Sequence, residues 1–292
     1  MAAMAAPVPP AVFDAHVHIW SADRQRYPMV PGRERPLSHD GSAETLLREM
    51  DAAGVGAALL VQTPWLGEDN SYLLDAVRRY PGRFAVLGWL EDPLAPDAPD
   101  RLQRQLEAEG CHGVRLHLTD ERVHAGVLAG MADPLFERAR RLGVPVQFLN
   151  RLPAHPAIDG VAQRFPGLDI VVDHLGHPDV TEAPGFASSG PFFALARHPR
   201  VYVKVSNHVL SSAEPYPWAD LHGYQQRLLD AFGPRRLMWG SNWPMQAPDL
   251  PYAPRLDAVR RELPALAALE EGQRSWLLGG TARALWPLRT GG

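Results

Sequence analysis

The chain lacks several features that would place it in other protein classes. It has 292 residues and a single cysteine, Cys111, which excludes an intrachain disulfide and is typical of a protein from a reducing compartment. No apolar run approaches the roughly 18 residues of a membrane span. The net charge is −4 with both signs interspersed, which disfavours a nucleic-acid or anionic-membrane surface. We therefore expect a soluble, cytoplasmic protein.

The first residues also lack the features of a leader peptide. Residues 1–10 are rich in alanine and proline but contain no basic stretch and no long apolar run. They are predicted to form a disordered tail. No linker or shift in composition divides residues 11–292, and the chain is 46% hydrophobic, so these residues are predicted to form one domain.

Short β-rich runs alternate with helical patterns along the chain. The runs span 12–18, 55–62, 84–90, 113–118, 144–149, 169–174, 201–206 and 236–241. The amphipathic stretches span 43–53, 69–80, 100–109, 131–142, 156–165, 189–198 and 219–231. Eight such units favour an α/β fold, a single-domain (β/α)8 TIM barrel, with residues 264–286 as closing helices. A doubly wound open sheet is the competing fold, but the Gly-x-Gly-x-x-Gly dinucleotide signature is absent.

Candidate catalytic residues stand where the predicted strands end. His16 and His18 are two residues apart and share one face with Asp14 at the end of the first run. His174 ends the sixth run, and Asn242 follows the eighth. Because the carboxyl ends of barrel strands surround one pocket, these side chains are expected to converge. Histidines in such a place can bind a metal or hydrogen-bond a carbonyl or carboxylate.

Further polar and aromatic side chains are predicted to contact a substrate. An inward arginine at position 115 would suit a carboxylate or a lactone carbonyl, although a structural ion pair is the alternative. Lys204, within the seventh run, is expected to pair with a carboxylate. The long segment 19–41 is predicted to lie over the site. The other candidate substrate-binding residues are His117, Gln62, Gln147, Tyr27, His208 and Trp243.

Together these motifs resemble the amidohydrolase superfamily (amidohydrolase-related family 2). More narrowly, they resemble its lactonase branch of L-fuconolactonase-like and 2-pyrone-4,6-dicarboxylate lactonase-like proteins. The matching segments are Phe13–Trp20, Val61-Gln62, Gly113–Arg115, Asp173–Pro178, Lys204–Ser206, Tyr216–Pro244 and Gly279–Trp286. The resemblance implies a (β/α)8 barrel and attack of water on the carbonyl of a sugar-derived or dicarboxylic lactone. It also implies that His16, His18 and His174 either bind metal or polarise the substrate.

One position departs from the pattern of that family. The resemblance implies a general-base aspartate after the eighth strand, where this chain has Asn242. A carboxamide cannot accept a proton from water at neutral pH. Three explanations remain open: an engineered replacement, natural chemistry with His174 or His117 as the base or with substrate-assisted proton transfer, and a non-catalytic binding protein. The change also removes an anionic metal ligand, so no cofactor is expected to be required, with one Zn²⁺ at His16, His18 and His174 as the alternative.

The leading functional hypothesis is therefore hydrolysis of a small carboxylated or polyhydroxylated lactone. Arg115 would hold the substrate anion, and His16, His18 and His174 would polarise the carbonyl. A metal-dependent non-oxidative decarboxylase of a small aromatic or enoic acid is the alternative enzyme, and a ligand-binding pseudoenzyme is the third reading. The expected partner is a small lactone or carboxylic acid, without nucleic acid or membrane, and the protein is expected to be a monomer or homodimer.

Overall fold

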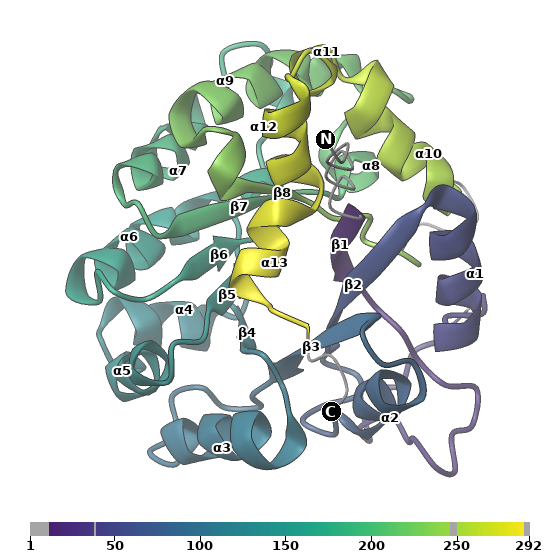
Figure 1. Ribbon diagram of the computed structural model, residues 1–292. Coiled ribbons are helices and arrows are strands. Elements are labelled where there is room, and N and C mark those ends of the chain that lie inside the picture. The colour runs from purple at the N-terminus through teal and green to yellow at the C-terminus, as the bar shows by residue number, and fades with distance from the viewer. Residues whose placement is uncertain (1–11, 38, 246–249, 289–292) are drawn as a thin grey trace, which may run out of the picture.

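Eight parallel strands form one sheet in the order β1 to β8, which confirms the predicted barrel (Figure 1). The computed structural model describes residues 12–37, 39–245 and 250–288, so the predicted tail 1–10 lies outside the described residues. Every predicted run contains one strand. The strands are β1 Val12–Val17, β2 Val55–Val61, β3 Phe84–Trp89, β4 Val114–His117, β5 Val146–Leu149, β6 Ile170–Val172, β7 Val201–Val205 and β8 Leu237–Trp239.

The segment after β8 closes the barrel against β1. The amide of Asn242 donates to the carbonyl of His16 at 2.8 Å, and the amide of His18 donates to the carbonyl of Trp243 at 2.7 Å. Gly240 permits this approach, because an added Cβ there would lie 2.8 Å from the Cβ of His16. The closure itself therefore places residue 242 beside the two histidines of β1.

Helices follow most strands and pack on the outside of the barrel. Helix α1 illustrates how the sequence defines these helices. Ser42 caps its first turn, Gly54 ends it in a left-handed conformation, and Leu46 and Met50 are buried against the barrel. The short α4, α8 and α10 were not predicted. The α-helices are α1 Ala43–Ala53, α2 Ser71–Arg79, α3 Ala98–Arg104, α4 Glu121–Leu128, α5 Asp133–Leu142, α6 His155–Arg164, α7 Gly190–Ala194, α8 His208–Ser211, α9 His222–Phe232, α10 Tyr252–Asp257, α11 Pro264–Ala267, α12 Glu271–Ser275 and α13 Thr281–Leu285.

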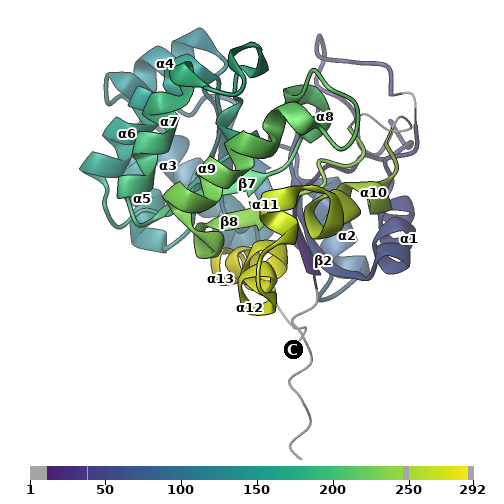
Figure 2. The same ribbon diagram turned by 90° about the horizontal axis from the view of Figure 1, so that it is seen from above.

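The C-terminal helices close one end of the barrel, as predicted for 264–286. In Figure 1, α12 and α13 cross that end, and in Figure 2 they lie opposite α8 and the purple segment that follows β1. Trp286, just after α13, is fully buried and packs with Phe13, Ala15 and Met238 inside the barrel. This apolar end is the floor of the barrel, so a polar site can form only at the opposite end, the mouth.

The segment between β1 and α1 packs along the mouth of the barrel. The amide of Trp20 donates to the carbonyl of Gly41 at 2.9 Å, and the amide of Val30 donates to the carbonyl of Trp65 at 2.8 Å. These bonds tie the segment to the loop that follows β2. No helix in the described part of the chain is long and apolar enough to span a membrane.

Candidate active site

His16 and His18 lie at the mouth with their rings in contact. Their Nε2 atoms are 3.1 Å apart, and Nδ1 of His18 lies 2.7 Å from the carbonyl oxygen of Val61. Burial lowers the pKa of His16 well below its usual value, with the charge of Lys204 acting in the same direction. Burial, together with the charge of Arg115, lowers the pKa of His18 to about 3. Both rings are therefore neutral at pH 7.

Asp173, directly after β6, is the anionic centre of the site. Its Oδ2 accepts hydrogen bonds from Nε and Nη2 of Arg115 at 2.8 and 2.7 Å and from Nε2 of Gln147 at 3.0 Å. Its Oδ1 lies 3.3 Å from Nδ1 of His16 and 3.8 Å from Nζ of Lys204. Burial opposes ionisation, but Arg115 and the neighbouring basic groups hold the pKa of Asp173 well below its usual value.

His174 lies on the other side of His16, with ring centroids 4.6 Å apart. Its Nδ1 is 2.9 Å from Oγ of Ser206, which follows β7. Burial lowers the pKa of His174 well below its usual value, so this ring is also neutral. The three histidines predicted from the sequence are thus brought together at the ends of β1 and β6. We call His16, His18, Asp173, His174, Arg115 and Lys204 the reaction centre.

Asn242 occupies a tight turn that is fixed from both sides. Its backbone is left-handed, with φ at 57°, a conformation that asparagine adopts more readily than most residues. Its Nδ2 donates to Oδ1 of Asn207 at 2.9 Å, which leaves the Oδ1 of Asn242 as a hydrogen-bond acceptor. The side chain is 4% exposed. The amide can therefore orient a water molecule but cannot take its proton.

Asp14 holds this turn from behind. Its Oδ1 accepts from the amides of His16 at 3.1 Å and Ser241 at 2.8 Å, and its Oδ2 accepts from the hydroxyl of Tyr252 at 2.9 Å. Burial raises its pKa to about 6, although these hydrogen bonds act in the opposite direction. One carboxylate thus joins β1, the turn after β8 and α10.

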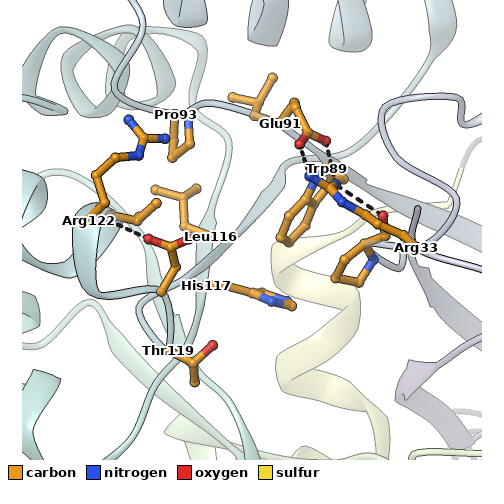
Figure 3. Close-up of a pocket in the computed structure, with 12 residues that line it drawn as sticks. Arg33, Trp89, Glu91, Pro93, Leu116, His117, Thr119 and Arg122 are labelled. Carbon is orange, nitrogen blue, oxygen red and sulfur yellow. Dashed lines mark hydrogen bonds and ion pairs between the residues drawn. The ribbon is translucent and has the colours of Figure 1, made fainter. Parts of the chain in front are cut away.

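A cavity of about 410 Å³ opens beside the reaction centre, at the ends of β3 and β4 (Figure 3). His117 and Trp89 project into it, with their rings edge to face and 4.4 Å between centroids. Nε2 of His117 is buried and has no hydrogen-bond partner within the described ranges of the chain. We call this cavity the side pocket. It is lined by Arg33, Pro64, Trp89, Leu90, Glu91, Pro93, Leu116, His117, Thr119, Asp120, Arg122 and Val123.

The two arginines of the side pocket are held by carboxylates. Nη1 of Arg33 donates to Oε2 of Glu91 at 2.8 Å, and Nη2 of Arg122 donates to Oδ1 of Asp92 at 3.0 Å. Figure 3 shows the Arg33–Glu91 pair on one side of His117 and Arg122 on the other. The predicted segment 19–41 thus reaches the pocket through Arg33.

The remaining predicted residues fall in different places. The amide of Gln62 is used within its own loop, donating to the carbonyl of Asp69 at 2.7 Å. Tyr27 hydrogen-bonds Asp75 of α2 and lines another hollow at the surface, away from the histidines. Trp243 is buried and pairs with Val17 in the barrel closure. The ring of His208 stacks on Trp218, with 4.9 Å between centroids. Of these four, only His208 keeps a buried nitrogen, Nε2, without a partner in the described structure.

Several residues of the site were not among the predicted catalytic or binding residues. Asp173 carried a signal, since it directly precedes His174 at a strand end. Lys204 is within a strand, and the expectation that it pairs with a carboxylate is confirmed by its contact with Asp173. Ser206 and Asn207 follow β7 and contact His174 and Asn242. Short polar side chains such as these occur in most loops, so no local pattern singled them out as site residues.

Three side chains of the reaction centre are spaced like the ligands of a metal ion. His16, Asp173 and His174 each offer a ligand atom, and these atoms lie within 4.8 Å of one another, a spacing that suits a metal. The Nε2 atoms of His16 and His18 lie 3.1 Å apart, a separation that suits either a shared proton or two ligands of one metal ion. Arg115 and Lys204 also place two basic groups against the carboxylate of Asp173. These basic groups weaken Asp173 as a ligand, so His16, His18 and His174 are the residues that would hold a metal ion.

Comparison with known proteins agrees with the fold. The amidohydrolase profile matches residues 13–288. The chain belongs to the amidohydrolase family. It is 30% identical to L-fucono-1,5-lactonase of Burkholderia ambifaria, over 80% of each chain. It is 26% identical to 2-pyrone-4,6-dicarboxylate hydrolase of Comamonas testosteroni, over 96% of this chain and 92% of that protein.

A third relative and a solved structure extend the comparison. The 4-sulfomuconolactone hydrolase of Hydrogenophaga intermedia is 27% identical over 81% of this chain and 76% of that protein. An amidohydrolase of Burkholderia multivorans, solved with bound zinc, has a TM-score of 0.79 and 27% identity, covering 96% of this chain and all of that one. Membership of this family makes the chain a hydrolase that acts on ester bonds.

Proposed function

We propose that the chain hydrolyses a small lactone by attack of water on the ester carbonyl, without a metal ion. The observation that carries the proposal is the group of three buried, neutral histidines beside Asn242 at the mouth of the barrel. The three relatives compared above are all lactone hydrolases by name, which supports the same reaction class.

His16 is suited to polarise the carbonyl. Its Nε2 contacts Nε2 of His18 at 3.1 Å in the resting protein, and a substrate carbonyl that takes the place of His18 would accept a hydrogen bond from it that strengthens as negative charge develops on the oxygen. Asp173 and Lys204 contact the ring, and Arg115 holds Asp173 in place. Because Asp173, Arg115 and Lys204 are already held by one another, the contact between the two histidines is the one that has to change when substrate arrives.

The attacking water is oriented by Oδ1 of Asn242, and its proton passes to His174. The oxygen of water bonds to the carbonyl carbon, the ring C–O bond breaks, and the departing ring oxygen takes up a proton to give a hydroxy acid. His174 is neutral and adjacent to His16, so it can accept the proton that Asn242 cannot. Its lowered pKa makes it a weaker base than a carboxylate tuned for this task.

The side pocket favours a hydroxylated substrate over a carboxylated one. Both arginines that line it are paired, Arg33 with Glu91 and Arg122 with Asp92. Arg115, predicted to anchor a substrate anion, is bound to Asp173 through two of its nitrogens. A carboxylate would have to displace one of these partners. Hydroxyl groups could bond to the carboxylates and to His117 without displacing the arginines.

A panel of lactones tests this proposal. Protein treated with a chelator is assayed against sugar-derived lactones of both ring sizes and against dicarboxylic lactones, with acid release followed by a pH indicator. We expect turnover of sugar-derived lactones, and we expect His174→Asn to lower kcat by about 10²-fold or more. His198→Asn is the matched control, because His198 bonds Asp159 at the surface and should leave the rate unchanged.

The other outcomes of this assay would replace the proposal. Thermal stabilisation by lactones without any turnover would indicate a binding protein. Decarboxylation of an aromatic or enoic acid by protein with stoichiometric zinc would indicate the alternative enzyme. Preference for dicarboxylic lactones would retain the reaction but overturn the assignment of the substrate.

A further inference from the structure

Glu91 is held at the wall of the side pocket by both its backbone and its side chain. Its amide donates to Oε1 of Glu68, which also accepts from Nη1 of Arg101 in α3. Its carboxylate accepts from Nη1 of Arg33 at 2.8 Å and from Nη2 of the same arginine, which belongs to the segment between β1 and α1. An exposed ion pair contributes little to stability. The contacts that fix Glu91 therefore call for a role other than stabilising the fold.

The carboxylate of Glu91 keeps free capacity to accept hydrogen bonds. The hydrogen bond from Arg33 lowers the pKa of Glu91, so the group is ionised at pH 7. Its side chain is 43% exposed. An ionised carboxylate offers about four lone-pair sites, and Arg33 occupies two of them. The other sites can accept the hydrogen of a ligand hydroxyl, but the group has no hydrogen to donate.

The register of the sheet brings Glu91 close to His117. Trp89 at the end of β3 is paired with Arg115 of β4. Glu91 and His117 each follow this pair by two residues, and both line the side pocket. Figure 3 shows the ring of Trp89 between them. A ligand ring lying over Trp89 therefore has the carboxylate of Glu91 on one side and the unpartnered Nε2 of His117 on the other.

The other two carboxylates near the pocket are used elsewhere. Asp120 caps α4, where its Oδ1 accepts at 3.0 Å from an amide of the first turn. Asp92 is not among the described residues that line the pocket, and its two oxygens accept from Nη1 and Nη2 of Arg122 at 3.4 and 3.0 Å. Glu91 is thus the carboxylate placed to meet a ligand beside His117.

The pocket lies at a suitable distance from the reaction centre. Arg115 belongs to the centre, and His117 projects from the same face of β4 two residues further on. Two residues of a strand span about 6.6 Å. That length is comparable to a small lactone ring with its substituents. A lactone whose carbonyl lies at the centre would therefore place its substituents in the side pocket.

We propose that Glu91 is a specificity-determining residue that accepts a hydrogen bond from one hydroxyl group of the substrate while His117 bonds a second. The substrate is then a lactone with at least two hydroxyl groups outside the ester. Either tautomer of His117 serves, because a hydroxyl both donates and accepts. A substrate carboxylate is disfavoured at this place, since Glu91 repels it and already holds the donors of Arg33. The inference rests on the proposed function for the position of the lactone carbonyl.

Sugar-derived lactams test this assignment without turnover, because the ring nitrogen makes them resistant to hydrolysis. Isothermal titration calorimetry compares a fully hydroxylated lactam with analogues that each lack one hydroxyl. We expect two of these analogues to bind the wild-type protein about 10-fold more weakly than the parent lactam. In Glu91→Met one of the two losses should disappear, and in His117→Leu the other should disappear.

The same variant should reverse the charge preference of the pocket. Glu91→Met keeps the length of the side chain and removes the carboxylate, which frees the donors of Arg33. A lactam that carries a carboxylate should then bind about 10-fold more tightly than to the wild-type protein. Glu137→Met is the matched control, because Glu137 pairs with Arg140 on the surface of α5 and has a similar exposure. It should alter neither readout.

Equal affinity of the wild-type protein for every lactam, or failure of all of them to bind, would overturn the proposal. So would a Glu91→Met variant that weakens all lactams equally and gains no affinity for the carboxylated one. Hydrolysis of lactones together with a flat lactam series would keep the proposed function and reject the role of Glu91. Hydroxyl-dependent binding without hydrolysis of any lactone would reject the reaction and keep the recognition of hydroxyl groups.

Discussion

The reaction centre and the side pocket lie next to each other at the mouth of the barrel, but their ion pairs differ in exposure to water. In the centre, the side chains of Arg115 and Asp173 are 4% and 0% exposed and their contacts are with one another. In the side pocket, Arg33 and Glu91 are 41% and 43% exposed. A charge pair removed from water is costly to break, whereas an exposed pair contributes little. The centre is therefore built to be rigid, and the pocket can exchange partners with a substrate.

The largest loss of stability is expected when one partner of the buried ion pair is removed. Asp173→Asn leaves the charge of Arg115 without its carboxylate, so we expect unfolding in urea to show a loss of about 3–5 kcal/mol. Asp92→Asn breaks the exposed pair with Arg122 and should cost about 1 kcal/mol or less. Equal losses in the two variants would remove the distinction between centre and pocket.

Acid should destabilise the protein through its buried histidines. Burial lowers the pKa of His155, His177 and His208 from 6.5 to about 4, so the unfolded chain binds protons below pH 6.5 that the folded chain does not. The stability that depends on these neutral rings is complete above pH 6.5 and is lost as the pH falls. These three groups alone give a slope of about 4 kcal/mol per pH unit near pH 5, and His16, His18, His117 and His174, whose pKa values are also lowered, add to it.

One group offsets part of this slope. The pKa of Asp14 is raised to about 6, so between that pH and about 4 the folded chain holds a proton that the unfolded chain releases. Urea unfolding at several pH values measures the combined pH dependence of stability from all of these groups. In His208→Gln the slope should fall by about 1.4 kcal/mol per pH unit. A slope that stays the same in this variant would show that His208 is not held neutral by burial.

The unpartnered nitrogen of His117 should matter for substrate binding. His117→Leu keeps the contact with Trp89 but removes the group that we expect to bond a substrate hydroxyl. KM for the best sugar-derived lactone should rise by about 10-fold, the effect of about 1.4 kcal/mol, with a smaller change in kcat. Steady-state kinetics measure both. A fall in kcat at constant KM would place His117 in the chemistry instead.

The smallest effect is expected at the rim of the side pocket. Arg122→Gln removes an exposed arginine that is paired with Asp92, and a hydroxylated substrate should lose only about threefold in kcat/KM. A dicarboxylic lactone, if it binds through this arginine, should lose about 10-fold or more. Steady-state kinetics on one lactone of each class therefore show which class of lactone contacts Arg122.

The fold was predictable because its signals repeat along the chain. Eight apolar runs of strand length, each between helical patterns, leave few arrangements, and the carboxyl ends of the strands fixed where His16, His18 and His174 would meet. The partners of these residues were not predictable in the same way. Whether Arg115 bonds a substrate or Asp173 depends on side-chain directions across three strands. No local sequence pattern encodes these directions.

The partners of loop residues were equally hard to predict from the sequence. Gln62 and Tyr27 look equally available to a substrate in the sequence, but the structure places both in local hydrogen bonds, with Asp69 and Asp75. Lys204 was expected to meet a carboxylate and does. Its contact with His16 depends on the short distance between β1 and β7 across the barrel, which no local pattern encodes.

In the proposed reaction, Asn242 is the residue that limits the rate on an otherwise complete scaffold. The most direct test compares the wild-type protein with Asn242→Asp, both treated with a chelator, on the sugar-derived lactones. The new carboxylate would stand at the place where water is oriented, and it should raise kcat by about 10²-fold, with Asn242→Ala showing no gain. Hydrolysis by the wild-type protein and a large gain in Asn242→Asp would support the account. Absence of turnover from both proteins on every lactone would contradict it.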